Sequence, residues 1–252
     1  MTLELAARSI RARYRESLLG IAWSVLNPLL LVIVYSFVFG VIFNARWSGP
    51  DNESASFAII LFAGLIPHSF LSEVFSKVPG IIAGNANFVK KLVFPLEILV
   101  PVELCAALFN ASISCAVLLT LHLYLGGSFT VTSLYAPLML CAVVPSILGL
   151  SWFIAATGVY FRDMGQIIPI VTMLLLFLCP IFYPYDAIPE AYRGYLLLNP
   201  LTIPVEQFRA VLLFGVHPDW ILLGNYIAVS MTVMMVGFWW FQLTRKGVAE
   251  VI

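Results

Sequence analysis

Long stretches without a charged residue constrain the fold of this chain more than any other feature of its sequence. Such stretches separate Glu16 from Arg46, Glu53 from Glu73, Glu103 from Arg162, Asp163 from Asp186 and Asp219 from Arg245. Only α-helices and closed β-barrels satisfy every backbone hydrogen bond inside a bilayer, and barrel strands appear as alternating segments of about ten residues. Because the uncharged stretches here are longer and continuously apolar, they predict membrane-spanning helices.

The composition supports the same class. Only 10% of the residues are charged and 62% are hydrophobic, with a mean hydropathy of +1.00. Soluble domains carry about 25% charged residues, so the composition excludes an ordinary soluble enzyme. The 13 basic and 13 acidic residues cancel, and without a net positive charge we expect no nucleic acid partner.

A helix needs about 20 residues to cross the hydrocarbon of a bilayer. The longest uncharged stretch is interrupted by the turn-like Gly126-Gly127-Ser128 and therefore holds two spans. We expect six spans, at about 20-43, 57-75, 100-124, 134-160, 165-184 and 220-243. The predicted fold is an all-α integral membrane protein in which residues 1-252 form a single transmembrane domain.

The distribution of Lys and Arg predicts the orientation, because short cytoplasmic loops are enriched in them. With both termini on one side, that side carries Arg8, Arg11, Arg13, Arg15, Lys77, Lys90, Lys91, Arg162, Arg245 and Lys246, whereas the other carries Arg46, Arg193 and Arg209. We therefore expect both termini to be cytoplasmic. Glu4 and Glu16 in the basic start, and the long apolar run after it, do not resemble a cleaved signal peptide, so Met1 is expected to begin the mature chain.

The sequence shows no motif for catalysis or for an energy source. It contains neither the G-x-x-x-x-G-K-[ST] phosphate-binding loop nor the H-E-x-x-H zinc motif. The four cysteines, Cys105, Cys115, Cys141 and Cys179, lie in predicted spans without a C-x-x-C pair, and we interpret them as small hydrophobic residues and expect no metal. If the chain transports a substrate, the energy is expected to come from another subunit.

Residues 1-18 have the pattern of an amphipathic helix. Leu3, Ala7, Ile10, Tyr14 and Leu18 share one helical face, and Arg8, Arg11 and Arg15 form a stripe beside it. This pattern is typical of a helix that lies in the membrane interface with its guanidinium groups near lipid phosphates. A plain topological anchor and a helix that contacts a partner fit equally well, and both can hold at once.

The polar segment 77-97 after the second span is too long for a simple turn. Pro79 is suited to open a short helix, and Pro95 interrupts the backbone before the third span. The apolar Phe88, Val89 and Leu92 beside Lys90 and Lys91 indicate a docking surface for another protein, with a membrane-surface amphipathic turn as the alternative. The turn that contains Arg162 and Asp163 either pairs with a partner or is simply solvated.

The external segment 185-219 is unusually apolar for a loop, yet neither half reaches a spanning length. Irregular backbone at membrane depth is tolerated only where protein or a cavity covers it. We therefore predict a re-entrant pair of half-helices between the fifth and sixth spans. Glu206 and Arg209, at positions i and i+3, are expected to pair there.

Aromatic residues gather in two predicted spans. Tyr35, Phe39 and Phe43 share a face of the first, and Phe177, Phe182, Tyr183 and Tyr185 crowd the outer half of the fifth. Aromatic rings stack on the apolar faces of sugars, which suggests a channel lined for sugars. Interfacial aromatic belts and lipid-facing Phe residues are the ordinary alternative.

Five motifs occur in order along the whole chain: Arg11-x-Arg13-Tyr14-x-x-Ser17-x-Leu19-Gly20-x-x-Trp23-x-x-x-x-Pro28, Phe88-Val89-Lys90-Lys91-x-x-Phe94-Pro95-Leu96-Glu97, Tyr160-Phe161-Arg162-Asp163, Pro180-Ile181-x-Tyr183 and Asn199-Pro200. Together they resemble the permease subunits of ABC-2 type exporters for polysaccharides, which include O-antigen, capsule and teichoic-acid exporters. The resemblance implies a half-transporter of the bacterial inner membrane that forms a homodimer and pairs with two separate ATP-binding-cassette subunits. It implies no cofactor in this chain and places ATP and Mg on the partner.

The same resemblance implies that the substrate is an undecaprenyl-pyrophosphate-linked polysaccharide that moves from the cytoplasmic leaflet outward. It implies that residues 1-18 gate access, with Arg8, Arg11 and Arg15 attracting the anionic headgroup. It further implies that 79-94, with Arg162 and Asp163, couples to the ATPase, and that 187-214 closes the outer mouth. Two alternatives stay open: a secondary transporter or channel that works without ATP, and a membrane scaffold.

Overall fold

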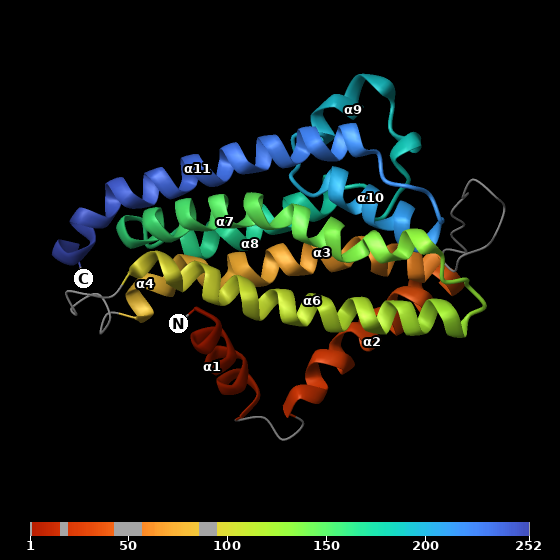
Figure 1. Ribbon diagram of the computed structural model, residues 1–252, viewed down its shortest axis with the longest axis horizontal. Helices are drawn as coiled ribbons and strands as arrows, with labels where there is room; N and C mark the ends of the chain where they lie inside the picture. The colour runs from red at the N-terminus through yellow and green to blue at the C-terminus, as the bar shows by residue number, and fades with distance from the viewer. Residues whose placement is uncertain (1, 16–19, 43–56, 86–94, 252) are drawn as a thin grey trace.

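The computed structural model describes residues 2–15, 20–42, 57–85 and 95–251, and within these ranges the chain forms helices and no strand (Figure 1). The α-helices are α1 (Thr2–Arg15), α2 (Trp23–Tyr35), α3 (Phe57–Lys77), α4 (Ile81–Gly84), α6 (Leu99–Tyr124), α7 (Ala136–Tyr160), α8 (Met164–Phe177), α9 (Glu190–Leu196), α10 (Thr202–Leu213) and α11 (Trp220–Val251). Short 3-10 turns occupy Gly20–Ala22, Val78–Gly80, Leu96–Ile98, Val131–Tyr135 and Tyr185–Ala187, and a π-helical segment, Ser36–Ile42, continues α2. The predicted all-α class is confirmed.

Four apolar helical stretches of the described chain are long enough to cross a membrane: Phe57–Gly84, Leu96–Tyr124, Val131–Tyr160 and Trp220–Arg245. They coincide with the predicted second, third, fourth and sixth spans. The predicted first and fifth spans contain shorter apolar helices, Trp23–Phe39 and Met164–Phe177. Six apolar helices are therefore present, but by length only four of them qualify as spans.

The prediction of a fifth span over 165-184 was wrong about its end. The helix α8 stops at Phe177, and Cys179 and Pro180 lie in the turn that follows. The Asn199 side-chain amide donates a hydrogen bond to the Leu175 carbonyl at 2.8 Å, which satisfies one of the acceptors that the end of a helix leaves without an intrahelical partner. Pro180 has no backbone N–H to continue the ladder. The helix therefore ends where distant residues take over its hydrogen bonds.

The predicted first and sixth spans also have different bounds. Gly20 has a φ of +50°, a conformation that favours glycine, and α2 begins only at Trp23, after a 3-10 turn. At the other end of the chain, α11 continues beyond residue 243 to Val251.

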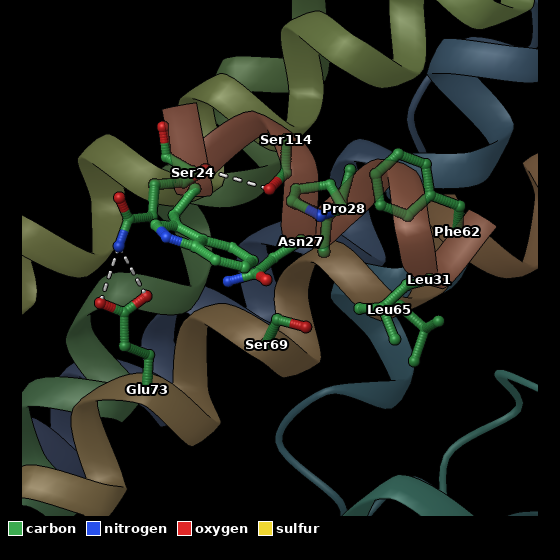
Figure 2. A pocket seen from close by; sticks show the side chains of 12 residues that line it. Ser24, Asn27, Pro28, Leu31, Phe62, Leu65, Ser69, Glu73 and Ser114 are labelled. Atoms are coloured by element: carbon green, nitrogen blue, oxygen red, sulfur yellow. Dashed lines mark hydrogen bonds between the residues drawn. The ribbon is translucent and has the colours of Figure 1, made fainter. Parts of the chain in front are cut away.

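The helix α2 packs on α3 and α6 less completely than its neighbours do. Of its residues only Ser24 and Pro28 are buried, and a pocket stays open between α2, α3 and α6 (Figure 2). In Figure 1 the last turn of α1 and the first turn of α2 lie away from the rest of the bundle.

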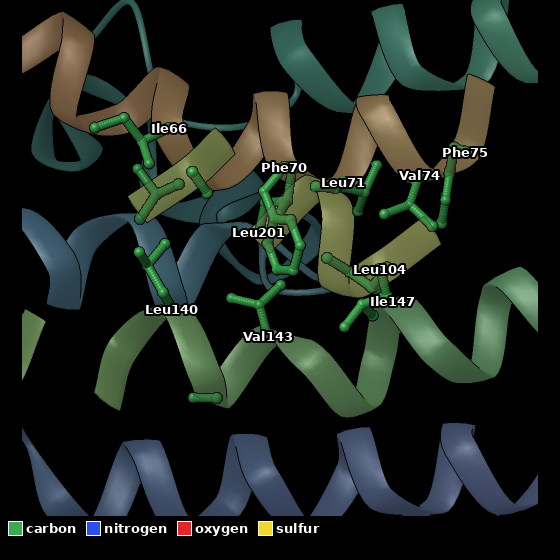
Figure 3. Packing of buried hydrophobic residues seen from close by; sticks show 14 of the residues in the cluster. Ile66, Phe70, Leu71, Val74, Phe75, Leu104, Leu140, Val143, Ile147 and Leu201 are labelled. Atoms are coloured by element: carbon green, nitrogen blue, oxygen red, sulfur yellow. The ribbon is translucent and has the colours of Figure 1, made fainter. Parts of the chain in front are cut away.

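The centre of the bundle is α3, whose side chains are buried on nearly every side. Figure 3 shows Phe70, Leu71 and Val74 of α3 packed among Leu104 of α6 and Val143 and Ile147 of α7. Glycine lets α7 and α11 approach closely. A Cβ on Gly149 of α7 would overlap backbone atoms of α11, and a Cβ on Gly237 of α11 would overlap backbone atoms of α7. The core is thus built on α3 and α7.

The two termini and α4 lie at one end of the molecule, and α9 and α10 lie at the other (Figure 1). The 3-10 turn before α4 packs on the last turns of α7, where a Cβ on Gly158 would lie 2.5 Å from the Pro79 carbonyl oxygen. The turn from α7 to α8, with Arg162 and Asp163, is therefore at the same end as α4. The termini, α4 and the turn between α7 and α8 thus lie at one end, as the predicted topology requires. The cytoplasmic location of this end stays a prediction.

Candidate functional site

An aromatic cluster joins α2, its π-helical continuation, α3 and the turn after α8. Phe182 is the centre: its ring lies 5.9 Å from the Phe39 ring and 5.7 Å from the Phe177 ring, both in stacked geometry, and 6.4 Å from the Tyr35 ring at an interplanar angle of 71°. Tyr35 and Phe39 are themselves 6.1 Å apart. Two regions that are more than a hundred residues apart thus form one aromatic surface.

The cluster contains four of the seven predicted channel residues and one that the sequence did not indicate. Phe57, the first residue of α3, places its ring 5.4 Å from Phe39. Tyr183 turns away and donates its hydroxyl to the Phe177 carbonyl at 2.8 Å, and the Tyr185 ring lies under the Arg193 guanidinium at 5.8 Å. Phe43 lies outside the described residues.

A buried arginine organises the same end of the molecule. Arg209 of α10 is only 1% exposed, and it donates hydrogen bonds to the carbonyl of Ile60 at 3.0 Å, to that of Ile181 at 2.7 Å and to that of Pro180. Its ion pair with Glu206, predicted from the i, i+3 spacing, is present at 3.2 Å. The guanidinium therefore joins α3, α10 and the turn after α8.

Gly64 of α3 makes room for this guanidinium, because a Cβ at that position would overlap the terminal Arg209 nitrogen. The sequence indicated the pair of charges but not the backbone carbonyls or the glycine, because these partners lie 28 to 149 residues away.

The two short helices of the external segment differ in burial. On α10, Val205, Phe208 and Val211 are completely buried, whereas on α9 Tyr192 and Tyr195 are 61% and 70% exposed. The segment thus contains two short helices, of which α10 belongs to the core and α9 lies outside it, and the re-entrant placement of the pair stays a prediction.

The helix predicted within residues 1-18 is present as α1, and its location in the membrane interface stays a prediction. Arg8 and Arg11 are exposed, and the side chain of Arg15 is outside the described part of the structure. Toward α6 the helix presents Ala6, which is buried, and Ser9, whose hydroxyl donates to a Glu103 carboxylate oxygen at 3.1 Å. The predicted apolar face did not include Ala6 or Ser9; of its members, Ala7 is exposed.

Ion pairs fix both ends of the predicted coupling loop. Lys77, where α3 ends, bonds a Glu103 oxygen of α6 at 2.7 Å. Beyond the loop, Glu97 accepts a bond from Arg245 of α11 at 3.2 Å, and its carbonyl accepts one from the Trp152 indole at 3.1 Å. The predicted short helix after Pro79 is present as α4, and Pro95 is extended at the position where an interruption before the third span was predicted.

The residues proposed to dock another protein, Phe88, Val89, Lys90, Lys91 and Leu92, lie outside the described residues. Arg162 and Asp163 are described, and both are exposed in the turn between α7 and α8.

The pocket between α2, α3 and α6 has a volume of about 490 Å³. Its wall combines apolar side chains with Trp23, Ser24, Asn27, Ser69, Glu73, Asn110 and Ser114. One Asn110 amide nitrogen donates to both Glu73 carboxylate oxygens, at 2.9 and 3.1 Å. In the sequence, Glu73 is only a charged residue near the end of a predicted span. Asn27 and Asn110 are polar residues within two apolar stretches, and they were the signal that could have indicated a polar pocket around Glu73.

Comparison with known proteins identifies the family. The family described as ABC-2 type transporter matches residues 2–213. The chain is 28% identical to the O-antigen export system permease protein RfbA of Myxococcus xanthus over 100% of this chain and 95% of that protein. It is 29% identical to the polysialic acid transport protein KpsM of Escherichia coli, over 92% and 88% of the two chains. A match over most of the chain confirms the resemblance expected from the five motifs, and the chain belongs to the ABC-2 type transporter family.

Proposed function

We propose that the chain is the membrane subunit of an ABC exporter that moves a lipid-linked polysaccharide from the cytoplasmic to the outer side of the bacterial inner membrane. In this proposal two copies of the chain form the passage, and two separate ATP-binding-cassette subunits bind ATP and Mg. The relatives named as O-antigen and polysialic acid transport proteins support it, since they align with this chain along nearly its whole length.

The observation that carries the proposal is the aromatic cluster. Tyr35, Phe39, Phe177 and Phe182 approach one another although they come from two distant parts of the chain, and Phe177 is 54% exposed. Stacked or tilted rings that keep an exposed face suit the apolar faces of sugar rings. A passage for an inorganic ion would instead need charged or carbonyl ligands at this position.

The remaining roles in the proposal follow the geometry. The segment between Lys77 and Glu97 is held by ion pairs at both ends, so a force applied to it by an ATPase would reach α3, α6 and α11. The exposed Arg8 and Arg11 of α1 would attract the pyrophosphate headgroup from the inner interface. Toward the outer side, α9 and α10 would act as the re-entrant cover of the passage.

The test is a double variant, Tyr35→Leu with Phe39→Leu. Leucine is as compatible with lipid as an aromatic residue but offers no flat face, so polymer export should fall about tenfold or more if stacking on each ring contributes about 1 kcal/mol. Export and substrate-stimulated ATP hydrolysis are measured in cells and in vesicles with the protein level held equal.

The matched control is Trp239→Leu, since Trp239 of α11 is 61% exposed and is outside the cluster. Polymer export by the Trp239→Leu variant should equal export by the parent chain. Full activity of the double variant in both assays would place these rings against lipid or a neighbouring helix and would refute the sugar-lined passage.

A further inference from the structure

The pocket between α2, α3 and α6 is separate from the aromatic cluster, and its wall belongs to one copy of the chain. Its polarity changes along its length. Figure 2 shows Glu73 at one end, Leu31, Leu65 and Phe62 at the other, and Asn27 and Ser69 between them. The pocket therefore has a polar end and an apolar end.

The polar end lies toward the end of the molecule that carries α4 and both termini. Glu73 is one helical turn before Lys77, where α3 ends, while Phe62 and Leu65 lie deeper in the same helix. Trp23, the first residue of α2 and about one helical turn before Asn27, also lines the pocket. A membrane lipid in the adjacent leaflet has the same orientation, with its headgroup at the interface and its acyl chain toward the bilayer centre.

The side chains at the polar end select among headgroups. The Glu73 carboxylate, which accepts hydrogen bonds from Asn110, has two acceptor oxygens with several lone pairs. The Asn27 amide and the Ser69 hydroxyl both donate and accept. A sugar hydroxyl both donates and accepts, so it can pair with the carboxylate, the amide and the serine hydroxyl without bringing a second charge into the pocket. The indole of Trp23 adds a flat apolar face of the kind that packs on a sugar ring.

We infer that this pocket binds an uncharged, hydroxyl-rich amphiphile, such as a glycolipid whose sugar reaches Glu73 and Asn27 and whose hydrocarbon chain lies along Leu31 and Leu65. The site is distinct from the passage of the proposed function and does not depend on it, because it needs neither a second copy of the chain nor an ATPase.

The experiment measures lipid binding to the full-length chain in detergent by native mass spectrometry, with monoglucosyl diacylglycerol and phosphatidylethanolamine as the two probes. The glucosyl lipid should bind more tightly than the ethanolamine lipid. Leu31→Trp, which fills the apolar end, should weaken binding of the glucosyl lipid about tenfold, and Asn27→Leu, which removes a headgroup partner, should weaken it by a similar factor.

Leu30→Trp is the matched control, because Leu30 is the adjacent residue on α2, is 51% exposed and does not line the pocket. Its affinity for the glucosyl lipid should stay within about twofold of the parent value, a change of less than 0.5 kcal/mol. The inference is overturned if both tryptophan variants bind the glucosyl lipid like the parent chain. It is also overturned if the ethanolamine lipid binds as tightly as the glucosyl lipid and loses affinity in Leu31→Trp and Asn27→Leu. Either result leaves the export test untouched, since that test uses different residues and a different measurement.

Discussion

Two polar groups that pack against opposite ends of α3, the buried Arg209 and the half-buried Glu73, have very different surroundings. At one end the Arg209 guanidinium is enclosed, and it donates to three backbone carbonyls and to Glu206. At the other end the Glu73 carboxylate is held by Asn110 but borders a cavity of about 490 Å³. A buried charge that the protein itself hydrogen-bonds has a structural role, whereas polar groups that line a cavity can also contact a ligand. The contrast predicts that changes near Arg209 lower stability and that changes near Glu73 mainly alter binding.

The largest effect is expected for Arg209→Met. It removes the donors to Ile60, Pro180 and Ile181 and leaves Glu206 beside a neutral side chain, so the free energy of unfolding should fall by about 3 to 5 kcal/mol. The measurement is thermal unfolding of the purified chain in detergent, together with the yield of folded protein. Arg209→Lys keeps the charge but not the forked geometry and should recover only part of the loss. Unchanged stability of Arg209→Met would contradict the structural role.

A smaller effect is expected for Gly64→Ala. The added Cβ would overlap the guanidinium of Arg209, and a shift of that side chain should cost about 1 to 3 kcal/mol. Gly194→Ala on α9 is the matched control, because nothing lies within 4 Å of its Cβ position. In thermal unfolding, Gly64→Ala should be clearly less stable than Gly194→Ala. Equal stability of the two variants would show that the Arg209 side chain can move aside.

The smallest loss of stability is expected for Asn110→Leu. It removes the donor that orients Glu73, but the carboxylate faces a cavity in which other polar groups are near, so the cost should be about 1 kcal/mol. The same variant should weaken binding of monoglucosyl diacylglycerol. A loss of stability as large as that of Arg209→Met would erase the difference between the two ends of α3.

The four long apolar helices were predictable because their length and continuous hydrophobicity are local properties of the chain. The early end of the fifth apolar helix was not, since α8 ends where Asn199 and Arg209 supply hydrogen bonds from distant segments. The aromatic cluster was predictable only in part. The aromatic groups of the first and fifth predicted spans could be seen in the sequence, but only the fold brings Phe182 against Phe39 and adds Phe57. The pocket at Glu73 was missed, because an acidic residue near the end of a span is usually solvated.

The sequence by itself determined the class of this protein, its apolar helices, its charge asymmetry and its family, because hydrophobicity, Lys and Arg placement and motif order need no knowledge of contacts. The tertiary structure alone decided which polar groups are enclosed and which border a cavity. The physical reason is that a buried hydrogen bond depends on donors and acceptors meeting within about 3 Å. The Arg209 nitrogen and the Ile60 carbonyl are separated by 149 positions along the chain, and only the packing of α10 against α3 brings them together.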